Sequence, residues 1–447
     1  MSNLDNNKEE IEVTTNETVV EQAKHEDQSY WAIVKRQFKK NRVAVWSLRF
    51  MILIAMIALL ADFLANEKPL MCKYEGNTYF PVFREYIVDF GGSWPKELSS
   101  IVDWKTTKFD YAIWAPVPYG QSETDFANAN YVSPLAKQNV KSLRWWHWLG
   151  TDEIGRDVMS GMIHGTRIAM MVGVVSMSIA SLIGIFMGAM AGYFGDEKLK
   201  ASLSSIILFI VSLPLAFFYG FQVRSYTISD AFSNSILSAL GQIIIGLVIF
   251  FIIIALGQLL AKLIDKILKA KPSINIPIDI IVSRVIEILL SVPSLLLIMS
   301  IVAIAKPSIM LVMVIIGATS WTGIARFTRG ELLRVRSLEY IEAAQSLGYS
   351  EWRTIFRHAI PNSLAPVLIA IAFGVAGAIL TESFLSFLGI GVEAEVQTWG
   401  KLLSLARKNF SAWWLALAPG FAIFITVTIY NLMGEGLTDA LDPRLKQ

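Results

Sequence analysis

Residues 338–362, LEYIEAAQSLGYSEWRTIFRHAIPN, predict a pair of short helices between two long apolar segments. Apolar residues recur at intervals of three along the first helix and form one stripe: Leu338, Ile341, Ala344 and Leu347. Gly348 is expected to end this helix, because a glycine just past a helix adopts the left-handed conformation that closes the last carbonyls. The small side chains of Ala343 and Ala344 let another surface approach this helix closely.

The second helix of the pair is predicted to follow Ser350 and to end at Pro361. Serine is a favoured N-cap residue, and Glu351 suits the positive end of the helix dipole. One side of the helix is expected to be apolar and another basic: Trp352, Ile355, Phe356 and Ala359, against Arg353 and Arg357. Proline lacks a backbone N–H, so it is predicted to stop the helix.

This stretch resembles the cytoplasmic coupling motif of ABC importer permeases. The motif residues are Glu342, Ala343, Ala344, Gly348 and Pro361, with Gly348 six positions after the glutamate and Pro361 thirteen after the glycine. In that family the motif helix occupies a groove on a separate ATP-binding subunit, so the resemblance implies that these five residues couple the chain to an ATPase. Glu-Ala-Ala alone is uninformative, since any solvated helix can contain it, but the full spacing in a basic loop favours the functional interpretation.

The composition indicates an integral membrane protein. Hydrophobic residues make up 54% of the 447 residues and charged residues only 17%, and the mean hydropathy is +0.50. A net charge of +2 gives no indication of a nucleic-acid partner. Cys72 is the single cysteine and the four histidines are scattered, so neither a disulfide framework nor a metal centre is predicted.

The expected fold is an all-α polytopic membrane protein with about eight spans, each near the roughly 20 apolar residues that cross a bilayer. The predicted spans are residues 43–64, 168–193, 201–221, 236–263, 280–305, 308–327, 364–385 and 412–433. Lysine and arginine cluster in alternate loops, which places both termini in the cytoplasm by the positive-inside rule. If one member of the hairpin 201–263 instead lay in the membrane interface, every later loop would change sides.

The remaining segments complete the predicted domain organisation. Residues 1–42 form a cytoplasmic N-terminal tail, and the apolar run begins too far from Met1 for a secretory signal peptide. Residues 65–167 form an extracytoplasmic cap of roughly 100 residues. Residues 280–433 form the permease core, with the coupling loop at 328–362, and residues 434–447 form a cytoplasmic tail.

Several sequence features predict local structure within the cap. Residues 74–79, YEGNTY, predict a β-hairpin in which Gly76 and Asn77 make the turn. Thr151 is expected to cap a helix whose first turn holds Asp152 and Glu153. The cap is rich in tryptophan, which either binds a ligand or partner or forms an aromatic belt or small core: Trp94, Trp104, Trp114, Trp145, Trp146 and Trp148.

Further stretches extend the resemblance to about residues 29–447, apart from the hairpin 201–263. NEKPL and YFPVF, at residues 66–70 and 79–83, are similar to peptide permeases of the microcin C uptake type. The second permease subunit of oligopeptide, dipeptide and nickel systems has stretches similar to HWLGTDEIGRD at 147–157, LTESFLSFLG at 380–389 and NLMGEGLTDALDP at 431–443. Such permeases have six spans, so the hairpin 201–263 resembles an insertion.

The sequence lacks the common motifs for nucleotide binding and catalysis. The sequence contains no Gly-x-x-x-x-Gly-Lys-Ser/Thr phosphate loop, no Gly-x-Ser-x-Gly elbow and no His-Glu-x-x-His zinc helix. We therefore predict that the chain is not an enzyme and binds no cofactor, and that ATP and magnesium belong to partner ATPase subunits.

Two acidic residues within apolar runs are candidates for the transport pathway. Charge in lipid is costly, so Glu287 and Glu382 should each face a partner or a watery cavity. Glu287 has Arg284 three residues before it on the same helical face, which favours a structural ion pair. Glu382 has no evident partner nearby in the sequence. Pro214 and Pro293 are expected to kink their helices.

The resemblance implies a transmembrane subunit of an ATP-driven importer for peptides or peptide-like solutes in a bacterial plasma (inner) membrane. Its implied partners are a second homologous permease subunit, two ABC ATPase subunits, an extracytoplasmic solute-binding protein and the lipid bilayer, with no nucleic acid. Three alternatives remain: an ion-coupled secondary transporter, a membrane receptor or scaffold that uses the Trp-rich cap, or export rather than import, although exporters of the superfamily that this sequence resembles commonly lack the coupling spacing. Paired intramembrane acids and inverted repeats, which would favour the first alternative, are not evident.

Overall fold

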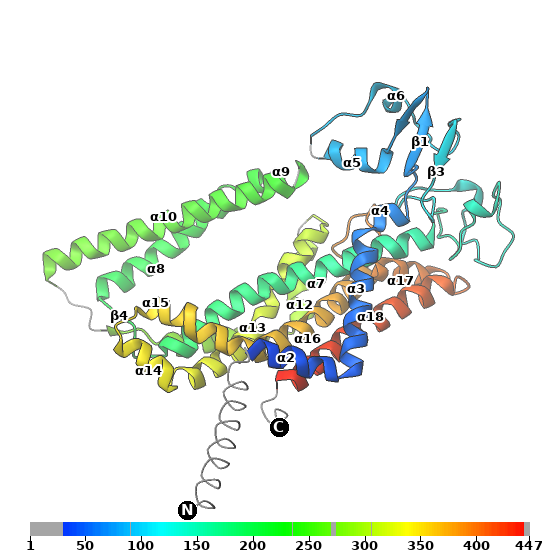
Figure 1. The fold of residues 1–447 in the computed structure, drawn as a ribbon. Coiled ribbons are helices and arrows are strands. Elements are labelled where there is room, and N and C mark those ends of the chain that lie inside the picture. The colour runs from blue at the N-terminus through cyan, green and yellow to red at the C-terminus, as the bar shows by residue number, and fades with distance from the viewer. Residues whose placement is uncertain (1–29, 90, 235, 270–273, 305, 442–447) are drawn as a thin grey trace, which may run out of the picture. The chain divides into compact units, whose positions relative to one another are not determined.

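The computed structural model describes residues 30–441, with gaps at 90, 235, 270–273 and 305 (Figure 1). Most of the predicted N-terminal tail and the end of the C-terminal tail, residues 1–29 and 442–447, lie outside this description. The chain divides into two compact units, one formed by residues 1–188 with 288–447 and the other by residues 189–287.

Long helices dominate the larger unit. Outside the cap, its long and short α-helices include α2 (Tyr30–Lys40), α3 (Arg42–Leu59), α4 (Ala61–Leu64), α7 (Val158–Ala189), α12 (Ser294–Ile304), α13 (Ile309–Val335), α14 (Glu339–Ser346), α15 (Glu351–Thr354), α16 (Ile360–Phe387), α17 (Trp399–Lys408) and α18 (Trp414–Leu441). α16 packs against both α13 and α18, and α18 packs against α3 (Figure 1). The core of this unit therefore brings the two ends of the chain together, because α3 and α18 are distant in sequence.

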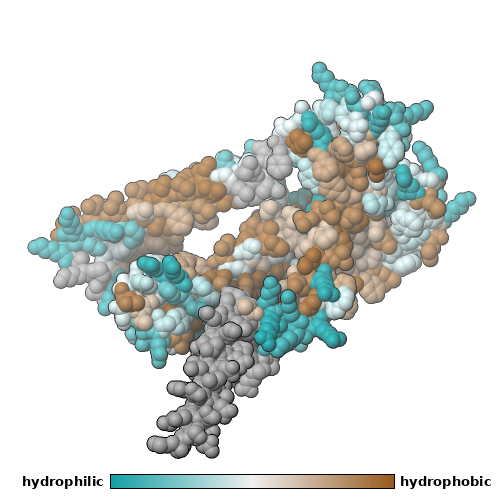
Figure 2. Space-filling model, in the orientation of Figure 1, coloured by the Kyte–Doolittle hydropathy of each residue, from teal (hydrophilic) through white to brown (hydrophobic). Residues whose placement is uncertain are grey.

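The all-α polytopic fold is confirmed. Within the described residues, seven helices are long and apolar enough to cross a membrane, and an eighth results if α11 (Ile278–Ser291) and α12 count as one interrupted span. The interruption falls at Val292 and Pro293, where the sequence predicts a kink. Hydrophobic residues cover the long helices, and hydrophilic residues gather on the cap (Figure 2).

Several helix bounds differ from the predicted spans. α7 begins at Val158 rather than Ile168, so its first turns belong to the stretch predicted as the cap, residues 65–167. α18 continues to Leu441, into the predicted tail 434–447. In both cases, polar residues extend the helix beyond its apolar run, which a criterion based on hydropathy alone does not detect.

Two glycines allow α7 to pack directly on the backbone of α13. A Cβ atom on Gly184 would lie 2.7 Å from Ile324 Cβ, and one on Gly188 would lie 2.5 Å from the Ala325 carbonyl oxygen. Ser176 Oγ also donates a hydrogen bond to the Met313 carbonyl at 2.9 Å. Small residues are typical of tight helix contacts in membranes, where backbones must approach closely.

Gly188→Ala should therefore lower the free energy of unfolding by about 1–3 kcal/mol, because α7 must move away from α13. Thermal unfolding of the purified protein in detergent would measure the loss. Gly323→Ala is the matched control, because nothing lies within 4 Å of its added Cβ. Equal midpoints for the two variants would contradict the packing argument.

The cap contains a small antiparallel sheet with strand order β2-β1-β3, and the helices α5 (Pro81–Asp89) and α6 (Lys96–Ser99). β1 (Met71–Tyr74) pairs with β2 (Asn77–Tyr79) and with β3 (Tyr111–Ile113). The predicted hairpin is confirmed, but its turn residues were wrong. Glu75 and Gly76, with φ of 49° and 80°, occupy the two turn positions, because Asn77 already pairs with Tyr74.

The smaller unit contains a helical hairpin. Its helical elements are η3 (Met190–Phe194), α8 (Leu203–Phe217), η4 (Phe218–Gln222), α9 (Ser225–Asn234), α10 (Ile236–Leu268) and most of α11; its strands are β4 (Lys200–Ala201) and β5 (Ile274–Asn275). α8 packs along α10 through small and polar residues. A Cβ on Gly220 would lie 2.9 Å from the Gly246 carbonyl, and Ser205 Oγ donates to Gln258 Oε1 at 2.5 Å. These contacts hold the two helices together while their outer faces stay apolar.

Candidate functional site

The first helix of the predicted coupling loop, α14, ends at Gly348 in the way the sequence predicts. Gly348 has φ of +78°; its N–H donates to the Gln345 carbonyl at 2.9 Å, and the Tyr349 N–H donates to the Ala344 carbonyl at 3.2 Å. This pair of bonds is the Schellman motif, which satisfies the last carbonyls of a helix. The chain reverses at Gly348 because glycine adopts this left-handed conformation at little cost.

The second helix of the pair begins as predicted but does not stop at Pro361. Ser350 Oγ accepts a hydrogen bond from the Arg353 N–H at 3.4 Å, as an N-cap. α15 then runs through a π-helical turn, η5 (Ile355–Ala359), directly into α16. The prediction that Pro361 ends the helix was wrong: it lies in the first turn of α16, where the preceding wider turn can accommodate the proline ring and its missing N–H.

The loop hides part of its apolar surface and exposes the rest. Ile341, Ala344, Ile355 and Ala359 are buried. Leu347, Trp352 and Phe356 are exposed by 74%, 50% and 58%, although the sequence places them on the same stripes. The Trp352 and Phe356 rings stack at 5.9 Å, and Glu342 and Ala343 are also exposed.

Exposed arginines belong to this loop and to the end of α13 that leads into it. The Arg353 guanidinium lies 4.5 Å from the centre of the Tyr349 ring, which is itself at the surface. Arg334, at the end of α13, forms an ion pair with Glu331 at 2.8 Å. Exposed aromatic residues next to arginine are typical of protein interfaces, so this surface has the composition of a docking site.

The helices on either side of the loop are joined again at their far ends. Lys401 Nζ, in α17, donates to three carbonyls of the loop between α16 and α17, those of Glu393, Ala394 and Val396, at 3.2, 2.5 and 2.7 Å. The Glu393 carboxylate in turn accepts from the Ile309 N–H at 3.2 Å, at the start of α13. α13 and α16 are therefore connected both at the coupling loop and at the opposite end.

The two pathway candidates have different surroundings. Glu287 accepts a hydrogen bond from Arg284 Nη1 at 2.5 Å, and both side chains are exposed, as expected of a surface ion pair. Glu382 is only 1% exposed, and its carboxylate accepts from Ser386 Oγ at 2.5 Å. The sequence did not identify this serine partner four residues later in α16. A pathway role for either glutamate remains a prediction.

Residues 147–157 do not form the predicted helix; they contribute four side chains to a buried polar centre: His147, Thr151, Asp152 and Asp157. The Thr151 side chain does not cap a helix: its hydroxyl donates to the Asn128 carbonyl at 2.7 Å and accepts from the Val132 N–H at 3.0 Å. The cap of α7 is Asp157, which accepts from the Ser160 N–H at 2.7 Å. An aspartate directly before an apolar run was a signal for this N-cap that the sequence analysis did not use.

His147 is the centre of this region, and its structural role was not predicted from the sequence. Its ring is fully buried, with Nδ1 2.7 Å from Asp157 Oδ2 and Nε2 3.3 Å from Asp125 Oδ2. Gln138 binds the backbone of His147 on both sides, at 2.8 and 3.0 Å. The histidine thus links the cap to the first turn of α7.

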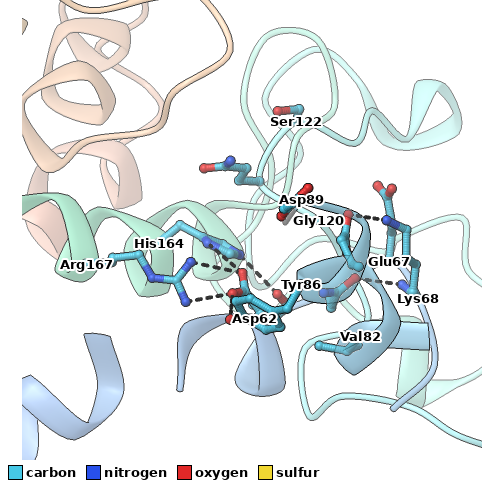
Figure 3. Close-up of a pocket in the computed structure, with 14 residues that line it drawn as sticks. Asp62, Glu67, Lys68, Val82, Tyr86, Asp89, Gly120, Ser122, His164 and Arg167 are labelled. Carbon is cyan, nitrogen blue, oxygen red and sulfur yellow. Dashed lines mark hydrogen bonds and ion pairs between the residues drawn. The ribbon is translucent and has the colours of Figure 1, made fainter. Parts of the chain in front are cut away.

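A polar cavity of about 380 Å³ lies where the cap meets α4 and α7 (Figure 3). On one side, Asp62 accepts two hydrogen bonds from Arg167, at 3.1 and 2.8 Å, and one from Tyr86. On another side, Lys68 pairs with Glu85. Within the described residues, no group of three or more histidine, cysteine, aspartate or glutamate side chains is placed to hold a metal ion.

Comparison with known proteins identifies the family. The model of the binding-protein-dependent transport system inner membrane component matches residues 267–447, and that of the N-terminal TM domain of oligopeptide transport permease C matches residues 29–80. The dipeptide transport system permease protein DppC of Alkalihalophilus pseudofirmus is 30% identical over 336 residues, which cover 75% of this chain and 82% of that protein. The chain belongs to the peptide ABC transporter permease family.

Two relatives match this permease over nearly its whole length. The inner membrane ABC transporter permease protein YejE of Escherichia coli is 26% identical over 422 residues, covering 93% of this chain and 97% of that protein. The peptidoglycan transport system permease protein YejE of Agrobacterium fabrum is 26% identical over 430 residues, covering 92% of each. The resemblance found in the sequence is therefore confirmed, and the relatives are permease subunits rather than enzymes.

Proposed function

We propose that this permease is the transmembrane subunit of an ATP-driven importer for peptides or peptide-like solutes, coupled to its ATPase through residues 338–362. The names of its relatives, which include dipeptide, oligopeptide and peptidoglycan permeases, support the solute class. The exposed stacked pair Trp352 and Phe356 beside the Gly348 turn is the observation that favours the coupling role. The five motif residues Glu342, Ala343, Ala344, Gly348 and Pro361 belong to the same loop.

The loop has the geometry of a lever. α15, η5 and α16 form one helical stretch from Glu351 to Phe387, about 55 Å long at 1.5 Å per residue. Movement of an ATPase bound to Trp352 and Phe356 would therefore shift the opposite end of α16 as well. Because Glu393 ties that end to α13, both helices would move together and alternate the access of a pathway between the two sides of the membrane.

The proposal includes the partners and orientation that the resemblance implies. A second homologous permease would complete the pathway, two ABC ATPase subunits would supply ATP and magnesium chemistry, and a solute-binding protein would deliver the cargo. Both termini and the coupling loop would lie in the cytoplasm of a bacterial cell. The exposed docking surface favours this function over an ion-coupled transporter, which needs no ATPase partner.

Trp352→Ala combined with Phe356→Ala should weaken binding of the ATPase subunits and lower uptake at least tenfold, since interface aromatics are often worth about 2 kcal/mol or more each. Co-purification of the cognate ATPase subunits and ATP-dependent uptake into vesicles would measure both effects. Tyr111→Ala removes an equally exposed aromatic ring from β3 in the cap and serves as the control. Unchanged uptake and co-purification in the double variant would overturn the proposal.

A further inference from the structure

A second cavity in the cap, of about 520 Å³, has the features of a ligand site. It is distinct from the coupling loop, and its size falls in the range of about 300–1,000 Å³ typical of small-molecule pockets. Three aromatic residues form its apolar walls: Trp104, Tyr119 and Trp145. Acidic and basic side chains also line it: Glu67, Asp103, Lys105, Glu123, Asp125 and Lys141.

The aromatic walls are held in place before any ligand arrives. Trp104 stacks on Phe109 with ring centres 6.2 Å apart. Tyr119 stacks on the buried His147 ring at 4.2 Å, and its hydroxyl donates to the Trp145 carbonyl at 2.7 Å. Little conformational entropy would be lost on binding, because these side chains are already fixed.

Lys105 and Glu123 belong to the wall and form an ion pair with each other. Their charged groups lie 2.5 Å apart, and the Lys105 ammonium lies 3.6 Å from the centre of the Tyr119 ring. Burial lowers the pKa of the Lys105 ammonium and raises the pKa of the Glu123 carboxyl, while attraction between the two groups opposes both shifts. The net charge of this pair is therefore balanced within the wall.

Glu67 and Lys141 differ from that pair. Their side chains make no hydrogen bond or ion pair with any other part of the chain that the structure describes, yet both line the cavity. Glu67 also lines the neighbouring polar cavity, and Figure 3 shows it beside Gly120. A Cβ at Gly120 would lie 2.7 Å from Glu67 Oε2, so the glycine leaves room for this carboxylate.

We propose that this cavity binds a short peptide with free ends, before it enters the pathway. Glu67 would accept the peptide ammonium, Lys141 would bind its carboxylate, and an apolar side chain would pack against Trp104 and Trp145. Carboxylates outnumber basic groups in the lining, which favours recognition of the amino terminus. The peptide class rests on the proposed function, but the site itself requires neither ATP nor the coupling loop.

Calorimetric titration of the dipeptide Leu-Phe into the permease pair in nanodiscs, without ATPase or ATP, tests the site. Saturable binding is expected, and Glu67→Gln should weaken it about tenfold, which corresponds to the loss of one ion pair of roughly 1.4 kcal/mol. N-acetyl-Leu-Phe has no free ammonium, so it should bind weakly to the unmodified protein. Glu67→Gln should not weaken its binding any further. Lys141→Gln should weaken the binding of Leu-Phe but leave the binding of the C-terminally amidated dipeptide unchanged.

Glu97→Gln, at an exposed position in α6, should bind Leu-Phe normally and is the matched control. Absence of saturable binding would overturn the inference, and so would Glu67→Gln and Lys141→Gln variants that bind Leu-Phe as tightly as the unmodified protein. This result is separable from the coupling claim, because the Trp352→Ala, Phe356→Ala double variant should lose uptake yet bind Leu-Phe normally. Loss of binding in that double variant would also count against the site.

Discussion

Gly348→Val is expected to reduce ATP-driven uptake about tenfold or more. Gly348 has φ of +78°, and a left-handed backbone costs an ordinary residue roughly 1–2 kcal/mol, with β-branched side chains at the upper end. Nothing lies within 4 Å of the added Cβ, so the effect is conformational rather than a clash. The turn between α14 and α15 would open, and the exposed surfaces of the two helices would no longer face one partner together.

Gly348→Asn is the control for this experiment, because asparagine adopts the left-handed conformation far more readily than valine. Uptake by the asparagine variant should stay within about twofold of the unmodified protein, which corresponds to a few tenths of a kcal/mol. Thermal unfolding should change little in the asparagine variant, and the valine variant should lose no more than the roughly 1–2 kcal/mol of backbone strain, because nothing lies within 4 Å of the added Cβ. Normal uptake by Gly348→Val would show that the angle between the helices does not matter for coupling.

His147→Leu should be the most destabilising single change in the cap, at about 3–5 kcal/mol. Leucine is similar in size to histidine, so little volume is lost, but the buried Asp157 carboxylate would keep only its bond from the Ser160 N–H. An unpaired carboxylate in an apolar environment is far costlier than a cavity of a few atoms. Thermal unfolding in detergent, followed by the yield of folded protein, measures the loss.

His147→Gln tests whether the destabilisation comes from the lost hydrogen bond to Asp157. Its amide can donate to Asp157 from about the same position, so it should recover at least half of the lost stability. Equal destabilisation by leucine and glutamine would indicate that the ring matters through its stacking on Tyr119 instead. No destabilisation in either variant would refute the role assigned to this buried polar centre.

The membrane helices and the coupling turn could be predicted because local signals determine them. A run of about 20 apolar residues identifies a span whatever its neighbours are. Gly348 and Ser350 likewise give reliable helix ends, since a left-handed glycine and a serine cap act within a few residues. The predictions that failed here depended on the wider surroundings. The prediction for Pro361 failed because a π-turn adjusts the helix before it, and the prediction for Thr151 failed because its hydroxyl bonds to distant cap residues.

The cap cavity could not be predicted from the sequence. Glu67, Trp104 and Lys141 lie far apart along the chain and share one cavity only after the cap has folded. Periodicity predicts which residues share a helix face, but contacts between irregular loops have no such pattern. The same limit explains why the exposure of Leu347 was missed: the α14 stripe is longer than the surface on which it packs.

The central claim is that residues 338–362 lie in the cytoplasm and bind the ATPase. Ala343→Cys in a Cys72→Ser background places one exposed thiol on α14, and Cys72 itself is buried. A membrane-impermeant maleimide should label this thiol in inside-out vesicles but not in intact cells, and bound ATPase subunits should protect it. Labelling from outside intact cells would place the loop on the wrong side and contradict the account.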